Sequence, residues 1–336
     1  MIRQAVLLVG GRGTRVWPLT ASMPKGLLPV AGVPFIELQF RLLAEVGVEE
    51  VILAVGTDHQ DEWRAYAESV SRPSVLISVE ETPLDTAGPV AAVRDQLDDR
   101  FLVLNGDVVL EGQLSEFVSR APEAPAVLAL VEVADTSAYG VVVTGPGGMV
   151  DRFIEKPPAG TAPTNTVNAG MYLMRREVIE RYPPGRLSFE RVVFPNLVDS
   201  GELGAVTIEG EWLDIGTPEL LLATHDAVAA GRSRLVRFPE PVPDPWAHVE
   251  PGATIEEGAT FEQAIALAGA TVRAGATVRR AIIGRGAVIE AGATVTGASI
   301  IGEDAVVGGG CEINHGARIA PGAQLGPGSL TFAPPA

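Results

Sequence analysis

Two patterns of hydrophobic and polar positions follow one another along this chain of 336 residues. From residue 1 to about residue 230, short apolar runs alternate with segments whose apolar residues have helical spacing. The clearest runs, which predict buried strands, are QAVLLVG (4–10), VEEVILAVG (48–56), VLISVEE (75–81) and FLVLNGD (101–107). Between the first two runs, PFIELQFRLLAEVG (34–47) predicts a helix that ends at a glycine. This alternation predicts an α/β domain built on a mostly parallel, Rossmann-like sheet with both faces covered.

The second pattern begins after a proline-rich stretch, RFPEPVPDPW (237–246). From there apolar residues recur at every sixth position, in a register that resets about every 18 residues, and small residues precede them in tetrapeptides such as PGAT and EGAT. The apolar series is Val249, Ile255, Phe261, Val272, Val278, Ile283, Ile289, Val295, Ile301, Val307, Ile313, Ile319 and Leu325. A period of six predicts a parallel β-helix with three short strands in each coil and glycine at its corners. These hexapeptides resemble the left-handed β-helix family, and an unstructured segment would not keep its aliphatic residues in register.

The two patterns divide the chain into domains. We expect an α/β domain over residues 1–235, a proline-rich linker over 236–247 and a β-helix domain over 248–336. In a parallel sheet, ligands bind at the carboxyl ends of the strands. Both the glycine-rich loop after the first strand and the NGD tripeptide (105–107) follow predicted strands directly, so a ligand site is expected there.

Net charge narrows the possible partners, and cysteine content indicates the cellular compartment. The formal charge of −17 argues against nucleic acid or an anionic membrane as a partner. An anionic substrate would therefore need local cations and a bound metal ion. Cys311 is the only cysteine, which excludes an internal disulfide and suggests a reducing cytoplasm. No signal peptide or membrane-spanning segment is expected from the sequence.

The loop VGGRGTRVWPLTASMPKG (9–26) carries the first candidate chemistry. Its glycines would let backbone N–H groups approach a phosphate closely and form an anion nest. Arg15 and Lys25 stand far enough apart to approach phosphates from two sides. The loop lacks both the Walker and the Rossmann glycine spacing. On its own, a tight turn with solvated basic residues remains an alternative.

Several further motifs give the loop a family context. GGRGTRVWPLTASMPK resembles the signature of the sugar-phosphate nucleotidylyltransferases. The remaining motifs follow in the family's order: NGD (105–107), YGVV (139–142), FIEKP (153–157), NAGMY (168–172) and WLDIGTPE (212–219). The resemblance covers nearly the whole chain, because a hexapeptide tail often accompanies this fold. It implies transfer of a nucleoside monophosphate from an NTP to a sugar 1-phosphate, with release of pyrophosphate.

The resemblance implies a role for each charged residue of the motifs. Arg15 would hold the triphosphate and the leaving pyrophosphate, and Lys25 would bridge the α-phosphate and the sugar phosphate. Both act by charge stabilisation and positioning. Asp107 and Asp214 match the family's two metal-binding aspartates, and hard carboxylate oxygens suit Mg²⁺.

Two further sets of residues are implied for the two substrates. The nucleotide-binding set, from the loop and from the segment near residue 85, is Gly10, Gly11, Gly13, Thr14, Glu80, Thr86 and Gly88. The set for the sugar phosphate is Tyr139, Gly140, Glu155, Lys156 and Asn168. For Tyr139, packing as a core aromatic is the alternative to a sugar contact.

The chain departs from the family in PLDTAGPV (83–90), where Asp85 replaces a glycine. If that position requires a positive φ, aspartate can still adopt it. Its carboxylate would then lie near a site that binds anions.

The nucleobase and the sugar are inferred from fewer residues. Glu80 stands where thymidylyl and uridylyl members tend to carry glutamine, and a carboxylate can accept from guanine N1–H and N2–H₂ together. PFIELQF (34–40) and SFERVVFP (188–195) also resemble the guanylyltransferases of mannose and heptose 1-phosphates. GTP is therefore the favoured nucleotide. The acceptor alternatives are mannose, heptose or glucose 1-phosphate and a sugar-like cyclitol phosphate, and a thymidylyl- or uridylyltransferase is the alternative enzyme.

Two other classes of function remain open. Left-handed β-helices also form acyltransferases, in which a histidine acts as general base, and the tail offers His248 and His315. A packed or corner histidine is the alternative for both. A non-catalytic regulatory homologue is the third possibility. The apolar faces and the unpaired end of the β-helix predict a homo-oligomer, a dimer or a tetramer, assembled through this domain.

Overall fold

The computed structural model describes residues 2–331. The chain forms two compact units. The first contains the residues up to Gly11 together with Ile36–Leu213, and the second contains Arg12–Phe35 and the chain from Asp214 onward. The glycine-rich loop is therefore divided between the units. Gly10 and Gly11 belong to the first unit, and Gly13, Arg15 and Lys25 belong to the second.

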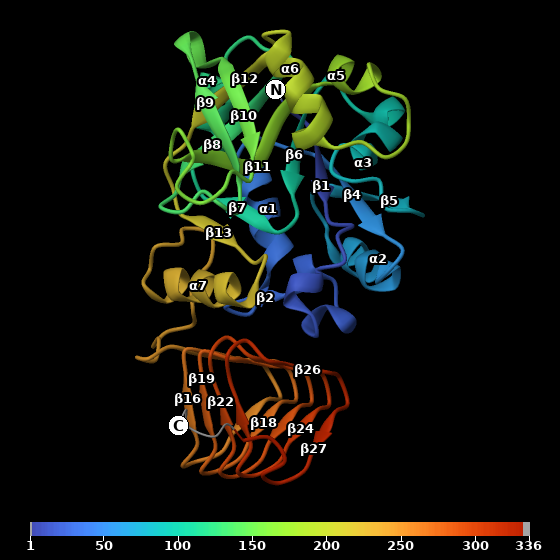
Figure 1. The fold of residues 1–336 in the computed structure, drawn as a ribbon. Coiled ribbons are helices and arrows are strands. Elements are labelled where there is room, and N and C mark those ends of the chain that lie inside the picture. Colours follow the sequence, from blue (N-terminus) through green and yellow to red (C-terminus); the bar gives the residue numbers. More distant parts are fainter. Residues whose placement is uncertain (1, 332–336) are drawn as a thin grey trace. The chain divides into compact units, whose positions relative to one another are not determined.

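The first unit is built on one mixed sheet (Figure 1). Its strands are β1 (Gln4–Leu8), β4 (Glu50–Gly56), β5 (Ser74–Glu80), β6 (Arg100–Asn105), β8 (Ala126–Glu132), β9 (Gly140–Thr144), β10 (Val150–Glu155), β11 (Thr166–Arg175) and β12 (Leu203–Thr207). Strands β6, β1, β4 and β5 are parallel neighbours, which confirms the four strands expected from the apolar runs. Strand β11 runs antiparallel to β6 and β8, so the sheet is parallel only in part. A separate pair joins β7 (Val108–Leu110) to β13 (Trp212–Asp214).

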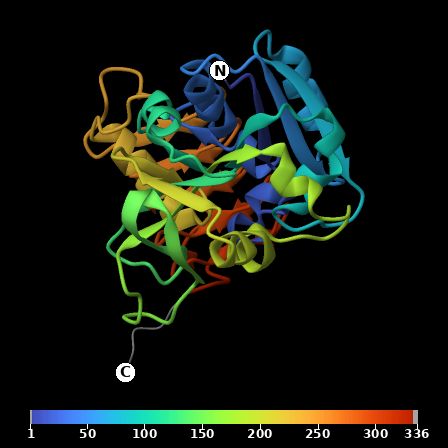
Figure 2. The same cartoon turned by 90° about the horizontal axis from the view of Figure 1, so that it is seen from above.

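Short helices cover this sheet. They are α1 (Phe35–Ala44), α2 (Gln60–Ser69), α3 (Gly88–Ala92), α4 (Leu114–Arg120), α5 (Arg176–Glu180) and α6 (Phe194–Asp199), with the shorter turns η4 (Arg94–Gln96), η5 (Pro146–Gly148) and η6 (Phe189–Val193). The predicted helix at 34–47 is confirmed as α1. Helix α2 lies against β4 and β5, as both views of the ribbon show (Figures 1 and 2).

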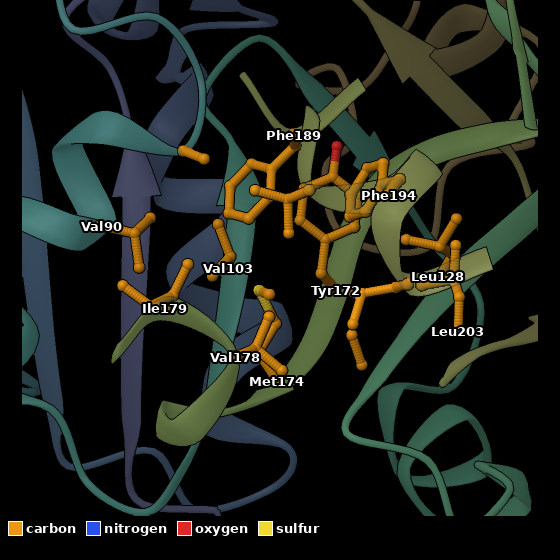
Figure 3. Packing of buried hydrophobic residues seen from close by; sticks show 14 of the residues in the cluster. Val90, Val103, Leu128, Tyr172, Met174, Val178, Ile179, Phe189, Phe194 and Leu203 are labelled. Atoms are coloured by element: carbon orange, nitrogen blue, oxygen red, sulfur yellow. The ribbon is translucent and has the colours of Figure 1, made fainter. Parts of the chain in front are cut away.

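An aromatic cluster lies at the centre of the main core of this unit (Figure 3). The ring of Tyr172, on β11, lies 5.4 Å from the ring of Phe189 and 5.1 Å from that of Phe194. All three side chains are fully buried. Close packing of this kind holds side chains in single rotamers. Strand β11, which carries Asn168, is therefore firmly anchored.

The second unit combines the end of the glycine-rich loop with the C-terminal region. Its first segment contains η1 (Thr14–Val16), η2 (Leu19–Ala21), η3 (Lys25–Leu27), β2 (Pro29–Val30) and β3 (Val33–Pro34). Helix α7 (Pro218–Ala229) begins with the Thr217 side chain accepting from the Leu220 N–H at 3.3 Å, as an N-cap does. With 12 residues α7 is longer than the other described helices, and none of the helices within residues 2–331 could cross a membrane.

The rest of the second unit is a left-handed parallel β-helix, as the period of six and the resemblance of its hexapeptides predict. Its strands are β14 (Ala247–Val249), β15 (Thr254–Ile255), β16 (Thr260–Glu262), β17 (Ala264–Ala266), β18 (Thr271–Val272), β19 (Thr277–Arg279), β20 (Ile282–Ile283), β21 (Val288–Ile289), β22 (Thr294–Val295), β23 (Ile300–Ile301), β24 (Val306–Val307), β25 (Glu312–Ile313), β26 (Arg318–Ile319) and β27 (Gln324–Leu325). They stack into three parallel sheets, visible as the orange and red coils of Figure 1.

The hexapeptide series forms the core of this β-helix, with one exception. Val272, Ile289 and Ile313 are fully buried, as the pattern predicts. Val249 is 42% exposed, so its expected place in the core is wrong. It lies on β14, which pairs only with β17 of the following coil, and a terminal coil buries less of its apolar surface than an internal one.

Candidate functional site

The carboxyl ends of three neighbouring strands meet at Glu80. This residue ends β5 and lies in register with Gly56 at the end of β4. A Cβ atom on Gly10, just after β1, would overlap Glu80 Oε1 and would lie 3.0 Å from the Gly56 nitrogen. Glycine at position 10 therefore makes room for the carboxylate. The predicted nucleotide residues Gly10 and Glu80 lie side by side.

A backbone hydrogen bond fixes the Glu80 carboxylate. Its Oε2 accepts a hydrogen bond from the Leu84 N–H at 3.1 Å. Burial raises the pKa of this carboxyl, and the Leu84 N–H counteracts the rise. A partly desolvated acceptor held in this way is suited to receive N–H donors from a ligand.

The segment after Glu80 is fastened to the chain near residue 187. The N–H groups of Ala87 and Gly88 both donate to the Leu187 carbonyl, at 2.9 and 3.0 Å. The Thr86 hydroxyl donates to Glu190 at 2.7 Å and accepts from the Phe189 N–H at 2.9 Å. A Cβ on Gly88 would lie 2.6 Å from the Gly185 carbonyl oxygen. Thr86 and Gly88 thus both have partners within the protein. Their contacts with the nucleotide remain predictions.

Asp85 has the left-handed conformation that the replaced glycine suggests, with φ at +68°. Its carboxylate forms an ion pair with Arg191 and lies 3.6 Å from Arg186 Nε. Only 14% of the Asp85 side chain is exposed. The two guanidinium groups neutralise the charge that would otherwise repel a nucleotide. Sequence reasoning missed both arginines, because they lie about a hundred positions away from Asp85.

The predicted metal ligand Asp107 lies in a turn between β6 and β7. The buried side chain of Gln39, on α1, donates from Nε2 to the carbonyl of Asn105 at 2.7 Å and to that of Val108 at 3.0 Å. The Gly106 N–H donates to the Leu8 carbonyl at 3.0 Å, which attaches the turn to β1. Gln39 was not a predicted site residue, although it lies in PFIELQF (34–40), because the sequence does not reveal which backbone carbonyls it binds.

Four of the predicted sugar-phosphate residues converge on one edge of the sheet. Glu155 lies in register with Gly140, and a Cβ on Gly140 would lie 3.1 Å from Glu155 Oε2. The Lys156 N–H donates to the Tyr139 carbonyl at 3.1 Å, and Lys156 Nζ lies 3.3 Å from Glu155 Oε1. Lys156 has a φ of +46°, a strained conformation for a side chain of this size. Strain held by neighbouring contacts is frequent at ligand sites.

Tyr139 packs beside Trp212 rather than in the core. The two ring centroids are 4.8 Å apart with the planes at 62°, and both side chains are only partly buried. Trp212 Nε1 donates to the Ala169 carbonyl at 3.2 Å. The core alternative for Tyr139 is thus wrong, and Trp212 joins the residues near the predicted sugar site.

Asn168 lies where β11 departs from regular pairing with β8. Its Oδ1 accepts from the Gly170 N–H at 3.0 Å, and its Nδ2 donates to the Tyr172 hydroxyl at 3.1 Å. Burial raises the pKa of Tyr172, whose ring and hydroxyl are shown in Figure 3. The amide of Asn168 is thereby held in one orientation, and one N–H remains for a substrate hydroxyl.

In the second unit, the glycine-rich loop folds tightly upon itself. Gly13 has a φ of +60°, and a Cβ there would lie 2.7 Å from Thr20 Cγ2 and 3.4 Å from Lys25 Cβ. The Thr20 hydroxyl donates to the Gly13 carbonyl at 3.0 Å. Glycine is therefore required here for both conformation and space. Thr14 and Arg15 are exposed and Lys25 is half-buried.

The loop meets the WLDIG motif within this same unit. A Cβ on Gly216 would lie 3.1 Å from Arg15 Nη2 and 2.7 Å from Asp214 Oδ1. The Gly216 N–H donates to Asp214 Oδ1 at 2.5 Å, and the Thr224 hydroxyl donates to the Asp214 carbonyl at 3.0 Å. The structure thus brings together Arg15 and Asp214, which the sequence places far apart. The joint role of Asp107 and Asp214 stays a prediction.

The donor chemistry fits a hard divalent cation. Among residues 2–331, no three His, Cys, Asp or Glu side chains are grouped closely enough to hold a metal ion. Mg²⁺ is commonly bound by one or two carboxylates, with substrate phosphates and water completing its shell. Asp214 supplies a carboxylate whose Oδ1 accepts the Gly216 N–H at 2.5 Å.

Both β-helix histidines have structural surroundings. His248 is 7% exposed and its ring lies 5.5 Å from that of His225. His315 is exposed and occupies a corner, with φ at +52°. The packed and corner alternatives are confirmed, and neither histidine is placed in the arrangement of an acyltransferase base.

The comparisons with known proteins agree with this geometry. Residues 4–231 match the family model described as nucleotidyl transferase, and residues 240–327 match the GMPPB C-terminal domain. The chain belongs to the nucleotidyl transferase family.

Relatives and solved structures extend the match. The chain is 36% identical over 227 residues to the mannose-1-phosphate guanyltransferase of Schizosaccharomyces pombe, covering 64% of this chain and 61% of that protein. It is 37% identical over 225 residues to the Neurospora crassa protein of the same name, again covering 64% and 61%. The chain therefore spans about three fifths of the length of these relatives.

The crystal structure of HddC from Yersinia pseudotuberculosis has a TM-score of 0.59 at 26% identity, covering 67% of this chain and 99% of that chain. HddC in complex with GMP-PN has a TM-score of 0.57 with the same identity and coverage.

Proposed function

We propose that this protein transfers a nucleoside monophosphate from an NTP to a sugar 1-phosphate and releases pyrophosphate. The observation that carries the proposal is the meeting of Arg15 with Asp214 beside Gly216 in a chain of the nucleotidyl transferase family. A cation for the leaving phosphates and a carboxylate for a metal ion are the two groups that this reaction needs near each other.

In the proposed mechanism the protein positions two polyanions and stabilises charge. An oxygen of the sugar phosphate attacks the α-phosphorus in line with the leaving pyrophosphate, and the α–β phosphoanhydride bond breaks. Arg15 binds the departing phosphates, while Lys25 binds the α-phosphate and the attacking phosphate. Backbone N–H groups at Gly11 and Gly13 hold phosphate oxygens. Asp107 and Asp214 would hold Mg²⁺, which neutralises phosphate charge when bound.

We favour GTP as the nucleotide. Glu80 presents a carboxylate whose Oε2 accepts from the Leu84 N–H and whose Oε1 faces Gly10. The two oxygens can accept the N1–H and N2–H₂ donors of guanine, whereas uracil and thymine offer one donor at their corresponding edge. The names of the fungal relatives and the nucleotide in the HddC complex support the same choice.

For the acceptor we favour mannose or heptose 1-phosphate, with glucose 1-phosphate or a cyclitol phosphate as the alternatives. Glu155 and Asn168 would bind sugar hydroxyls, Lys156 the phosphate, and the rings of Tyr139 and Trp212 the face of the sugar. Trp212 is an addition from the structure, since its ring lies against Tyr139.

A homo-oligomer formed through the β-helix, in the cytoplasm, is proposed as the working form of the protein. The three parallel sheets of the β-helix end at β25, β26 and β27, and no further strand pairs with these among the described residues. Light scattering of the protein at micromolar concentration would give a dimer or tetramer mass. A monomer mass would contradict this part of the proposal.

Two substitutions test the reaction itself. Lys25→Ala and Asp107→Asn should each lower pyrophosphate release from GTP and mannose 1-phosphate by at least about a hundredfold, because each removes charge stabilisation from the transition state. Circular dichroism and the melting temperature should remain those of the wild type. Arg232→Ala, in the chain after α7, serves as a control for the loss of a cation. Full activity in either site variant would remove the basis of the assignment.

A further inference from the structure

We propose that Gln39 is a positioning residue that fixes the turn carrying Asp107 and thereby sets metal affinity. The proposal rests on the proposed function, because it takes Asp107 as a metal ligand. The side chain lies on α1, within the PFIELQF stretch (34–40), whose resemblance to the guanylyltransferases implies no role for it. No motif or comparison assigns it a role.

Gln39 binds backbone groups on both sides of Asp107 in the sequence. Its Nε2 group donates one hydrogen bond to the carbonyl of Asn105 and one to the carbonyl of Val108, at 2.7 and 3.0 Å. These carbonyls belong to the last residue of β6 and the first residue of β7. A single amide group therefore uses both of its N–H bonds to close the turn whose centre is Gly106–Asp107.

The surroundings of Gln39 argue against a role in fold stability alone. Its side chain is fully buried, and its neighbours on α1, Leu38 and Phe40, are buried apolar residues. Its Oε1 receives no hydrogen bond, and Asn105 Oδ1 also lacks a donor. An unsatisfied buried oxygen destabilises a protein, so its retention calls for a compensating benefit. Fixing the Asp107 turn is that benefit.

The other contacts of the Gly106–Asp107 turn hold its first half, and Gln39 also holds its second half. The Gly106 N–H is bound to the Leu8 carbonyl, and a Cβ on Gly106 would lie 2.5 Å from Val9 Cγ1. These contacts hold the first half of the turn against β1. The Gln39 amide also ties the second half of the turn, at Val108, to the first half, at Asn105. Without it, the Asp107 backbone would gain freedom, and a metal ligand with more freedom binds less tightly.

The chain supplies a matched control for a substitution at Gln39. Gln4, on β1, is another buried glutamine, and its Nε2 donates to the Gln96 carbonyl at 2.8 Å while its Oε1 accepts from the Asp98 N–H at 2.8 Å. It too joins strand and loop backbone, but at the amino end of β1, away from the predicted site. Gln39→Met and Gln4→Met remove the same amide from comparable surroundings with little change in volume.

Metal affinity can be measured directly with Mn²⁺ as the probe. Electron paramagnetic resonance should give the full-length wild type and Gln4→Met the same Kd for Mn²⁺ in the presence of a non-hydrolysable GTP analogue. Gln39→Met should bind about tenfold more weakly, and Asp107→Asn should lose the same site. In activity assays, Gln39→Met should need about tenfold more Mg²⁺ for half-maximal rate and should regain most of its kcat at high Mg²⁺.

The outcomes separate this inference from the proposed function. An unchanged Mn²⁺ Kd in Gln39→Met, or an equal weakening in Gln4→Met, would overturn the role of Gln39. The absence of Mn²⁺ binding in the wild type would overturn it as well. If the wild type binds Mn²⁺ through Asp107, and Gln39→Met weakens that binding as expected, but the wild type releases no pyrophosphate with any sugar 1-phosphate, only the proposed function is contradicted. If Gln39→Met fails to fold, Gln39→Glu gives the same test, since it keeps the volume and loses the donors.

Discussion

Single side chains in this protein are held by partners that the local sequence does not reveal. Glu80 is the clearest case, because Gly10, Gly56 and the Leu84 N–H together define where its carboxylate lies. Asp85 is another, since its charge is balanced by Arg186 and Arg191. In each case, a carboxylate in the region of the predicted nucleotide site has a defined orientation and a physical reason for it.

A substitution at Glu80 tests base selection at this scale. Glu80→Gln replaces one acceptor oxygen with an N–H₂ donor, so guanine loses a partner and uracil or thymine gains one. We expect the ratio of kcat/KM for GTP to that for UTP to fall about 10- to 100-fold, which corresponds to the loss of one well-placed polar contact.

Glu81→Gln is the control for Glu80→Gln, because Glu81 is the adjacent glutamate and is exposed. It should leave the GTP to UTP ratio unchanged. An unaltered ratio in Glu80→Gln, measured by pyrophosphate release with both nucleotides, would show that Glu80 does not select the base.

At the scale of elements, two motifs that lie about two hundred residues apart in the sequence depend on one another. The turn after β13 places Gly216 against both Asp214 and Arg15. Helix α7 follows at once, and its Thr224 hydroxyl binds the Asp214 carbonyl. The position of Asp214, the proposed metal ligand, is therefore set by the end of a strand, by Gly216, which has no Cβ, and by the first turns of a helix.

Gly216→Ala tests this arrangement. The new Cβ would lie 2.7 Å from Asp214 Oδ1 and 3.1 Å from Arg15 Nη2, so the carboxylate and the guanidinium would have to separate. We expect kcat to fall by about a hundredfold, as for the displacement of a positioned catalytic group. Gly326→Ala is the control, because no atom lies within 4 Å of the Cβ that it would add. Near-wild-type kcat in Gly216→Ala would contradict the geometry.

The elements also show what a sequence can predict. Strands β1, β4, β5 and β6 followed from apolar runs, and the β-helix followed from its period, because both signals are local. The antiparallel course of β11 and the attachment of Thr86 and Gly88 to residues 187–190 did not follow, since they depend on distant pairing. The role of Gln39 was not predicted for the same reason. Its helical position is visible in the sequence, but the two carbonyls that it binds are not.

On the scale of the whole molecule, the second unit joins the loop to the β-helix. The Ala31 N–H, just after Lys25 and η3, donates to His225 Nε2 on α7 at 3.3 Å. The ring of His225 stacks on Trp246 at 5.4 Å and lies beside His248 of the first coil. Burial lowers the pKa of His225 to about 3 and that of His248 to about 4. The β-helix thus supports the segment that carries Arg15 and Lys25 through two neutral histidines.

This cluster predicts a loss of stability in acid. A histidine whose pKa is lower in the folded state binds fewer protons when folded, so stability is full above about pH 6.5 and falls as the pH drops toward 4. Between pH 6.5 and 5, each of the two histidines should reduce the free energy of unfolding by about 2 kcal/mol.

His248→Phe isolates one of the two contributions. It keeps an aromatic ring in the cluster and removes a titrating group whose Nε2 is buried without a hydrogen-bond partner. Its melting temperature should fall less between pH 7 and pH 5 than that of the wild type. Equal pH dependence in the wild type and His248→Phe, measured by differential scanning fluorimetry, would contradict the assignment.

The central claim is that this chain transfers GMP to a sugar 1-phosphate. The most direct measurement is kcat/KM for pyrophosphate release with Mg²⁺ and each of ATP, CTP, GTP, UTP and dTTP, in combination with mannose, heptose and glucose 1-phosphates. The proposed function predicts that GTP exceeds every other nucleotide by at least about tenfold with its preferred acceptor. Higher kcat/KM with UTP or dTTP than with GTP, or no pyrophosphate release with any pair, would contradict it.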